Sequence, residues 1–353
     1  MSLDPTLYPP ISPVTGDAPR PFWSVIVPAY KSKYLSKALH SVVDQAPPPE
    51  QMEIIVINDC SPEDLDPIVS EAGGQRVHYI KQPENRGTYP TENHGVTIAR
   101  GQWIHILNDD DWVLKGFYDA LQKSLQYQPE RIAAAFTGFT HVDEDGKEHS
   151  TPPPMRGAPG VIPDFIEQMG ISNRVHPIAI VFRRLCFEKL GGFNLNLNYC
   201  ADWEFNKRVA VHYDWWCEPK VLACYRMNSE SVSATTVKTG QQMRDLRYAI
   251  ELSERYLPAD RCERISRTSR EHYALFALRV ANQALKQHLL SPAILQIKEA
   301  IRMSQAPHVL QRLSEMMTTP PAAPLREAMV DFFARLEAAD APGDEPRSES
   351  KPK

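Results

Sequence analysis

Three consecutive carboxylates follow a short apolar run in the first third of the chain. The run covers residues 103–107, and the polar segment after it reads Asn108, Asp109, Asp110 and Asp111. Neighbouring carboxylates repel one another when they are ionised, so solvent or a bound cation must offset that repulsion. Mg²⁺ and Mn²⁺ prefer such oxygen ligands and share their other positions with water and substrate phosphates. The segment therefore indicates either a divalent-cation site or a solvated acidic turn.

Two more polar residues follow apolar runs in the same way. Tyr30 comes after residues 23–28, and Asp59 comes after residues 53–58. A tyrosine at such a place can stack on a nucleobase, and a carboxylate can accept a hydrogen bond from a base N–H. The alternative is structural, because Tyr30 can pack in the core and Asp59 can cap the helix that follows it.

A fourth acidic residue, Asp202, opens a predicted helix at residues 202–212. A carboxylate there can act as a general base, or it can be only a cap that interacts favourably with the helix dipole. Glu204 comes two residues later and so lies on a different side of the helix. This spacing predicts that Glu204→Gln has a mild effect.

The elements that would position these residues alternate between strands and helices. Apolar runs rich in β-branched residues predict strands, and apolar residues at helical spacing predict helices. The strands are expected at residues 23–28, 53–58, 76–80, 103–107, 133–142, 177–182 and 221–226, and the helices at residues 34–45, 91–99, 185–190 and 202–212. This order predicts an α/β fold with a mostly parallel, Rossmann-like sheet that has helices on both faces and ligands at the carboxyl ends of its strands.

The ends of the chain have a different character. Residues 1–21 contain six prolines and predict an extended leader. From about residue 240 the pattern becomes helical, with helices expected at residues 241–256, 262–287, 291–304, 307–316 and 324–337. Residues 338–353 are charged and proline-bearing, which predicts a disordered tail.

Composition and missing motifs exclude several classes of protein. The 353 residues carry a net charge of -5, which gives no overall basic field to hold nucleic acid. The chain has no phosphate-binding P-loop, no dinucleotide fingerprint, no nucleophile elbow and no zinc-protease motif. Six cysteines without a CxxC pair predict thiols in a reducing compartment. With neither a signal peptide nor a membrane-length apolar run, a cytoplasmic protein is expected, with peripheral docking at the inner face of the membrane left open.

Taken together, these segments resemble family 2 of the glycosyltransferases, whose members have the GT-A fold. The resemblance covers roughly residues 22–232 and depends on several motifs in order. They are Ser24–Tyr30, Ser41–Gln45, Glu53–Asp64, Glu84–Gly87, then Asn93, Gly95, Ala99 and Gly101, the acidic segment Asn108–Asp111, Leu190–Phe193, Asp202 and Tyr225–Arg226.

The resemblance implies a role for each matching residue. Tyr30 and Asp59 would contact the base, with the backbone near Pro28 beside it. Asp110 would hold the Mn²⁺ or Mg²⁺ ion that bridges the donor diphosphate. Asp202 would be the catalytic base.

Four further residues would complete the donor site. Asn108 stands at the first aspartate of the family's metal motif and keeps an oxygen ligand, with Asp109 beside it. Glu92 stands where an arginine commonly precedes Asn93, which makes Arg86 the expected phosphate partner. Arg226 lies in a stretch that is often near the donor phosphates or the acceptor in the family.

The expected protein is thus a metal-dependent, inverting glycosyltransferase. It would move a sugar from a UDP- or dTDP-sugar to a hydroxyl of a saccharide, lipid-linked or protein acceptor, in surface polysaccharide or glycoconjugate synthesis. The GT-A domain is expected at residues 22–235, with a nucleotide-binding half at 22–131 and an acceptor half at 132–235. Residues 240–337 would pack on that domain, or would form the surface for a homodimer or an acceptor complex. A non-catalytic nucleotide-sugar-binding scaffold and a nucleotidyltransferase are the alternatives.

Overall fold

The structure is a computed structural model that describes residues 4–31, 33–228, 236 and 239–327. The chain forms two compact units, Met1–His272 and Tyr273–Lys353. The tail predicted at residues 338–353 lies outside the described residues. The candidate site residues all belong to the first unit.

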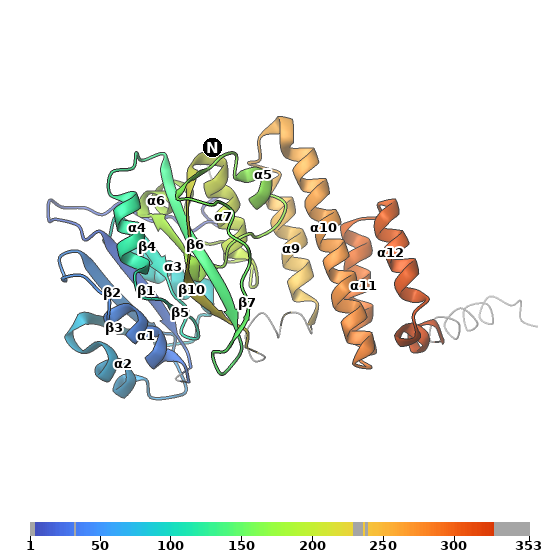
Figure 1. Ribbon diagram of the computed structural model, residues 1–353, viewed down its shortest axis with the longest axis horizontal. Coiled ribbons are helices and arrows are strands. Elements are labelled where there is room, and N and C mark those ends of the chain that lie inside the picture. Colours follow the sequence, from blue (N-terminus) through green and yellow to red (C-terminus); the bar gives the residue numbers. More distant parts are fainter. Residues whose placement is uncertain (1–3, 32, 229–235, 237–238, 328–353) are drawn as a thin grey trace, which may run out of the picture. The chain divides into compact units, whose positions relative to one another are not determined.

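One mixed sheet forms the centre of the first unit, and its main path runs β3-β2-β1-β4-β9-β6-β10-β5 (Figure 1). Its parallel part consists of β1 (Trp23–Ala29), β2 (Met52–Asn58), β3 (Val77–Lys81) and β4 (Trp103–Ile106). Strand β1 pairs in parallel with both β2 and β4. Each of these strands lies within one or two residues of its predicted position. The apolar runs of β1, β2 and β4 are buried on both faces, whereas β3 is only partly buried.

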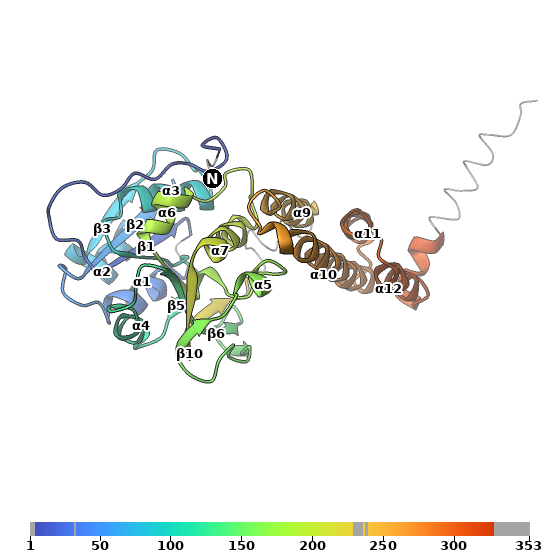
Figure 2. The same ribbon diagram turned by 90° about the horizontal axis from the view of Figure 1, so that it is seen from above.

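Helices cover both faces of this sheet. Figure 2 shows α3 (Thr88–Ile98) and α6 (Arg184–Leu190) on one side, and α1 (Leu35–Val43) and α4 (Phe117–Leu125) on the other. Helix α2 (Asp66–Gly73) connects β2 to β3 through the short 3₁₀ turn η1 (Gly74–Arg76). The predicted fold class, an α/β sheet covered on both faces, is confirmed.

The other part of the sheet mixes strand directions. Strand β9 (Ile180–Arg183) is antiparallel to both β4 and β6 (Ile132–Val142), and β6 is parallel to β10 (Asp214–Arg226). Shorter strands extend it: β5 (Trp112–Val113), β7 (Glu148–Ser150) and β8 (Gly160–Ile162). Helix α5 (Ile166–Met169), the 3₁₀ turn η2 (Pro177–Ala179) and α7 (Ala201–His212) complete this part.

Several elements differ from the prediction, and the short elements β5, β7, β8 and α5 were not predicted. Helix α4 was not predicted, although its apolar residues Phe117, Leu121 and Leu125 recur at helical spacing and are buried. Strand β10 begins at Asp214, whereas the prediction placed its start at residue 221. The prediction missed the first part of the strand because the apolar pattern is interrupted around Pro219, where the register also shifts. Residues 177–179 form a 3₁₀ turn instead of the first part of a strand.

The described part of the leader packs on the first unit. Tyr8 and Ile11 are buried, and the Pro9 carbonyl accepts a hydrogen bond from the Gly192 N–H at 2.8 Å. The Arg20 guanidinium donates to two backbone carbonyls at the start of β4. The segment lacks regular structure, as predicted, but its apolar side chains belong to the core.

The C-terminal part is helical, as predicted, with α9 (Gln241–Ser253), α10 (Ala259–Lys286), α11 (Leu290–Met303), α12 (Pro307–Met317) and the 3₁₀ turn η3 (Pro320–Ala322). The boundary between the units falls inside α10, so α9 belongs to the first unit. Most of the helix predicted at residues 324–337 lies outside the described residues.

Two further observations concern the whole described chain. All six cysteines are free thiols. Within the described ranges, none of the helices combines the length and the apolar character that crossing a bilayer requires.

Candidate active site

The carboxyl ends of β1, β2 and β4 lie side by side and bring the predicted nucleotide-site residues together. Ala29 at the end of β1 pairs with Asn58 at the end of β2, and the Leu107 N–H after β4 donates to the Ile26 carbonyl at 2.9 Å. The residues that follow these three strands therefore share one edge of the sheet. Parallel sheets usually bind their ligands at this edge.

Asp109 positions the backbone next to Tyr30. One of its oxygens, Oδ2, accepts hydrogen bonds from the backbone N–H of Tyr30 at 2.8 Å and of Lys31 at 3.0 Å. Burial raises the pKa of Asp109, and these two hydrogen bonds oppose that effect. The Tyr30 side chain is 40% exposed, so it is not a core residue and is available to a ligand.

Asp111 has a structural position. Its side chain is fully buried, and Oδ1 accepts a hydrogen bond from the Arg226 backbone N–H at 2.8 Å. Burial, followed by the charge of Asp110, raises the pKa of Asp111 well above its usual range, while a hydrogen bond from the Asn108 side chain lowers it. Asp111 therefore joins the acidic segment to the end of β10 rather than facing a ligand.

The Asp110 carboxylate accepts hydrogen bonds from its own backbone N–H and from the Asn228 side chain. Burial, followed by the charge of Asp109, raises its pKa to about 6, and Arg226 lowers it. Among the described residues, no cluster of three or more His, Cys, Asp or Glu side chains could enclose a metal ion. A site with one protein carboxylate nevertheless fits Mg²⁺ or Mn²⁺, since such ions take most of their other ligands from substrate phosphates and water.

Arg226 is held next to Asp110 and is itself buried. Its Nε donates to the Asp110 carbonyl at 2.9 Å, and its Nη1 donates to the Asp143 carbonyl at 3.2 Å. The guanidinium lies 3.9 Å from the ring centre of Tyr34 and 4.9 Å from that of Trp112. The predicted residue thus fixes the backbone of the acidic segment and places a positive charge beside it.

Asp59 connects the nucleotide edge to α3. Its Oδ1 accepts hydrogen bonds from Gln82 Nε2 at 2.9 Å and the Arg86 N–H at 2.8 Å, and its Oδ2 accepts one from the Gly87 N–H at 2.8 Å. Gly87 precedes the first turn of α3. Asp59 therefore holds the start of α3, not that of α2 which follows it in the sequence.

The two remaining donor-site predictions lie at the same edge. Pro28 is half-buried near the end of β1. Arg86 has an exposed side chain, while its backbone is fixed by Asp59. A long cationic side chain on a fixed backbone can reach an anionic ligand without reorganising the loop.

Asp202 lies in the first turn of α7, and side chains from two other segments hold it. Its Oδ1 accepts a hydrogen bond from the Tyr89 hydroxyl of α3 at 3.1 Å, and its Oδ2 accepts one from Asn173 Nδ2 at 3.0 Å. Burial raises the pKa of Asp202, and hydrogen bonds from the Trp203 N–H, Tyr89 and Asn173 lower it. A carboxylate with a raised pKa is a stronger base than an exposed aspartate.

Helix α3 therefore connects the two sets of carboxylates. Its start is held by Asp59 at the nucleotide edge, and two residues after Gly87 the Tyr89 hydroxyl contacts Asp202. The neighbouring Asn93 makes two hydrogen bonds with the backbone of Phe193, at 3.0 and 2.8 Å. Sequence reasoning missed Tyr89 and Asn173, because neither residue belongs to a pattern that announces a contact with Asp202.

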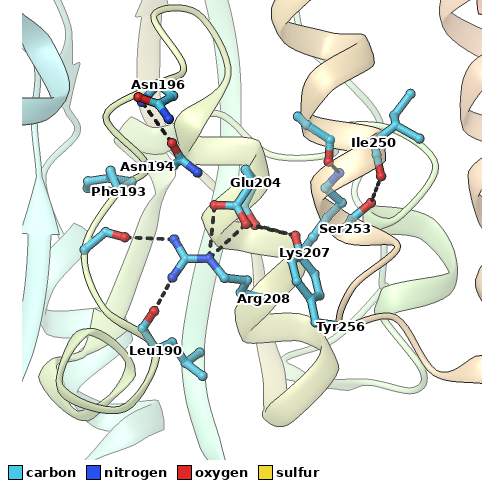
Figure 3. A network of polar contacts seen from close by, with 12 residues as sticks. Leu190, Phe193, Asn194, Asn196, Glu204, Lys207, Arg208, Ile250, Ser253 and Tyr256 are labelled. Carbon is cyan, nitrogen blue, oxygen red and sulfur yellow. Dashed lines mark hydrogen bonds and ion pairs between the residues drawn. The ribbon is translucent and has the colours of Figure 1, made fainter. Parts of the chain in front are cut away.

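Glu204 lies on another side of α7 from Asp202, in an environment where its substitution is expected to reduce stability. Figure 3 shows its carboxylate paired with Arg208, whose Nε lies 3.0 Å from both Glu204 oxygens, and with the Tyr256 hydroxyl at 3.0 Å. Both charged side chains are fully buried, and Arg208 also donates to the Leu190 and Gly192 carbonyls. Glu204 is part of the anchor that holds α7 in place.

A parallel half-sheet with an acidic edge is joined to a mixed half that carries a carboxylate at the start of a helix. This architecture is that of the GT-A glycosyltransferases. The glycosyltransferase TarS of S. aureus, residues 1–349, superposes with a TM-score of 0.61 at 15% identity, covering 87% of this chain and 91% of that chain. The mannosyltransferase PcManGT of Pyrobaculum calidifontis gives 0.54 at 16% identity, with 94% and 88% covered. These likenesses show the fold.

Sequence comparison finds relatives of one family over the first part of the chain. Residues 24–188 match the model of glycosyl transferase family 2. TuaG of Bacillus subtilis, named as a glycosyltransferase of teichuronic acid biosynthesis, is 34% identical over 131 residues, which are 36% of this chain and 50% of TuaG. An uncharacterized glycosyltransferase of Haemophilus influenzae is 24% identical over 234 residues, 61% of this chain and 72% of that protein. The chain thus spans half the length of TuaG, and its residues 24–188 are similar to family 2 of the glycosyltransferases.

Proposed function

We propose that this protein is an inverting glycosyltransferase that moves a sugar from a nucleotide-diphosphate sugar to an acceptor hydroxyl. The observation that carries the proposal is the division of labour among its carboxylates. Asp110 lies at the nucleotide edge, where its carboxylate accepts hydrogen bonds from its own backbone N–H and the Asn228 side chain, and Asp202 is a half-buried carboxylate with a raised pKa on a separate helix. A displacement reaction needs a base at the acceptor hydroxyl and a group that stabilises charge at the leaving diphosphate, and these two groups must lie at different places.

In the proposed reaction, Asp202 takes the proton of the acceptor hydroxyl. The acceptor oxygen forms a bond to the anomeric carbon as the bond from that carbon to the diphosphate oxygen breaks. The nucleoside diphosphate leaves with the electron pair, and the single displacement inverts the anomeric configuration. Asp202 ends the step protonated and neutral.

The residues around the diphosphate would stabilise its growing negative charge. Asp110 would hold a Mn²⁺ or Mg²⁺ ion, which supplies positive charge at the leaving diphosphate when it is bound. The structure of PcManGT with GDP-Man and Mn²⁺ supports this assignment. Arg86 would contact the phosphates directly, and Arg226 would act by its charge and by holding the Asp110 backbone.

The donor is proposed to be a UDP- or dTDP-sugar. Tyr30 is exposed for stacking, and Asp59 Oδ2 accepts a single hydrogen bond in the free protein, which leaves one lone pair for a pyrimidine N3–H. TarS has been solved with UDP-GlcNAc, with a TM-score of 0.59 at 15% identity over 79% of this chain and 90% of that chain. The likeness to TuaG supports an acceptor from surface polysaccharide synthesis.

The test is release of the nucleoside diphosphate from a panel of UDP-, dTDP- and GDP-sugars, with and without Mn²⁺. We expect release of UDP or dTDP that depends on the cation and is abolished by EDTA. Binding without release in every condition would favour a non-catalytic scaffold. Release of pyrophosphate from a nucleoside triphosphate and a sugar phosphate would instead identify a nucleotidyltransferase.

A further inference from the structure

The hydroxyl of Tyr89 lies between two acceptors that compete for its one proton. It is 2.9 Å from the Tyr199 carbonyl and 3.1 Å from Asp202 Oδ1. A phenol has a single O–H donor and can also accept through its oxygen. Both short contacts are therefore satisfied at once when Asp202 carries a proton. When Asp202 is ionised, the phenol can satisfy just one of its two acceptors.

We propose that Tyr89 is a positioning residue with two hydrogen-bond states, set by the protonation of Asp202. While Asp202 is ionised, the Tyr89 proton points to Oδ1 and stabilises the carboxylate. When Asp202 has taken the proton of the acceptor hydroxyl, it donates that proton to the Tyr89 oxygen, and the Tyr89 proton turns to the Tyr199 carbonyl. Tyr89 keeps its own proton throughout, so the balance of the reaction is unchanged. This inference rests on the proposed function of Asp202.

The surroundings of Asp202 make this hydrogen bond important. The titratable groups whose protonation couples to Asp202 are Tyr89 and Glu92 on α3 and Tyr199 and Cys200 just before α7. Burial raises the pKa of each of these groups, which favours its neutral form. None of them supplies a positive charge, and the ionised form of Asp202 depends on hydrogen bonds from Tyr89, Asn173 and its helix backbone.

The packing of Tyr89 allows the phenol to rotate its proton without moving the ring. Tyr89 is buried, and its ring packs against that of Phe193 with 5.7 Å between the centroids. The two acceptors are fixed from other elements, since the Tyr199 N–H is held by Asp245 Oδ2 at 3.0 Å and Asp202 is also held by Asn173. The change between the two states is therefore a rotation about the C–O bond alone.

The direct test is a pH titration of the Asp202 carboxyl carbon by NMR in the full chain labelled with ¹³C-aspartate. The signal is assigned by its loss in Asp202→Asn. In Tyr89→Phe, which keeps the ring and its packing, the ionised carboxylate loses a donor, and we expect its pKa to rise by about 1 unit. Tyr118→Phe is the matched control, since Tyr118 is a buried tyrosine whose hydroxyl pairs with His105 Nδ1 at 2.9 Å. It should leave the titration unchanged.

Two outcomes overturn the inference: an Asp202 titration in Tyr89→Phe that superimposes on the wild type, or an equal shift in Tyr118→Phe. Should Tyr89→Phe fold poorly, 3-fluorotyrosine at position 89 keeps the hydroxyl, and its more acidic phenol should move the titration to lower pH. The acid limb of turnover with the active donor of the panel should follow each shift. A shifted titration together with full activity of Asp202→Asn would reject the proposed function but not the hydrogen bond.

Discussion

The two sets of carboxylates in this domain are held by different kinds of donor. At the nucleotide edge, Asp59, Asp109 and Asp111 accept hydrogen bonds mainly from backbone N–H groups. In the acceptor half, Asp202 is held by a tyrosine hydroxyl and an asparagine amide as well as by its own helix. A backbone N–H is fixed by the fold, whereas a hydroxyl can turn. The carboxylates held by backbone N–H groups therefore fix the shape of the nucleotide site. Asp202, which is held partly by a hydroxyl that can turn, can change its protonation state.

The sharpest test of this comparison is Asp202→Asn. Asparagine keeps the size of the side chain and an acceptor oxygen for the helix, but it cannot take a proton. We expect turnover to fall by roughly 10²-fold or more while donor affinity and Tm stay the same. Steady-state kinetics, calorimetry with the donor and thermal unfolding measure the three quantities. Wild-type turnover in this variant would show that Asp202 is only a helix cap.

The second test compares two neighbours at the nucleotide edge. Asp110→Asn removes the carboxylate left for the cation, and we expect turnover to fall by about 10-fold or more and to respond less to added Mn²⁺. Asp109→Asn keeps an oxygen for the Tyr30 and Lys31 N–H groups and should cost less activity. Kinetics across a Mn²⁺ series distinguish them. Equal losses in the two variants would contradict the separation of structural and cation-binding carboxylates.

The pH dependence of turnover tests the acceptor half. Burial raises the pKa of Asp202, and the base must be ionised to accept a proton. Activity is therefore expected to be complete above this raised pKa and to be lost as the pH falls through it, in a range above the usual one for an aspartate. The measurement is kcat/KM as a function of pH. An acid limb at the pKa of an exposed aspartate would mean that Asp202 is not the group that titrates.

Glu204→Gln is expected to have the smallest effect on turnover. Its main effect is expected to be a loss of stability. It leaves the buried Arg208 without its counter-charge, and we expect the free energy of unfolding to fall by about 3 kcal/mol. Asp119→Asn is the control, since it breaks the exposed pair with Lys123, which has the same i,i+4 spacing, and should cost about 0.5 kcal/mol or less. Chemical denaturation gives both values. A Glu204 variant as stable as the control would show that the ion pair does not anchor α7.

Local sequence patterns were enough to predict the strands of the parallel half and most of the helices. Strands such as β1 and β2 are short apolar runs buried on both faces, so their identity is written in consecutive residues. The same reasoning placed Tyr30, Asp59 and the acidic segment at one edge, because the carboxyl ends of neighbouring parallel strands must meet. The full length of β10 could not be predicted, since Pro219 and the polar residues beside it disrupt the pattern within a single strand.

The partners of the carboxylates were decided by the tertiary structure alone. Asp109 and Asp110 are adjacent and chemically identical, yet one is bound to the backbone after β1 and the other is not. Asp202 meets Tyr89 across 113 positions of sequence, and Glu204 meets Tyr256 across 52. The sequence by itself determined which residues can ionise and which strand or helix carries them. Which of them is a base, a cation ligand or an anchor depends on burial and on donors from distant segments, and these exist only when the chain is folded.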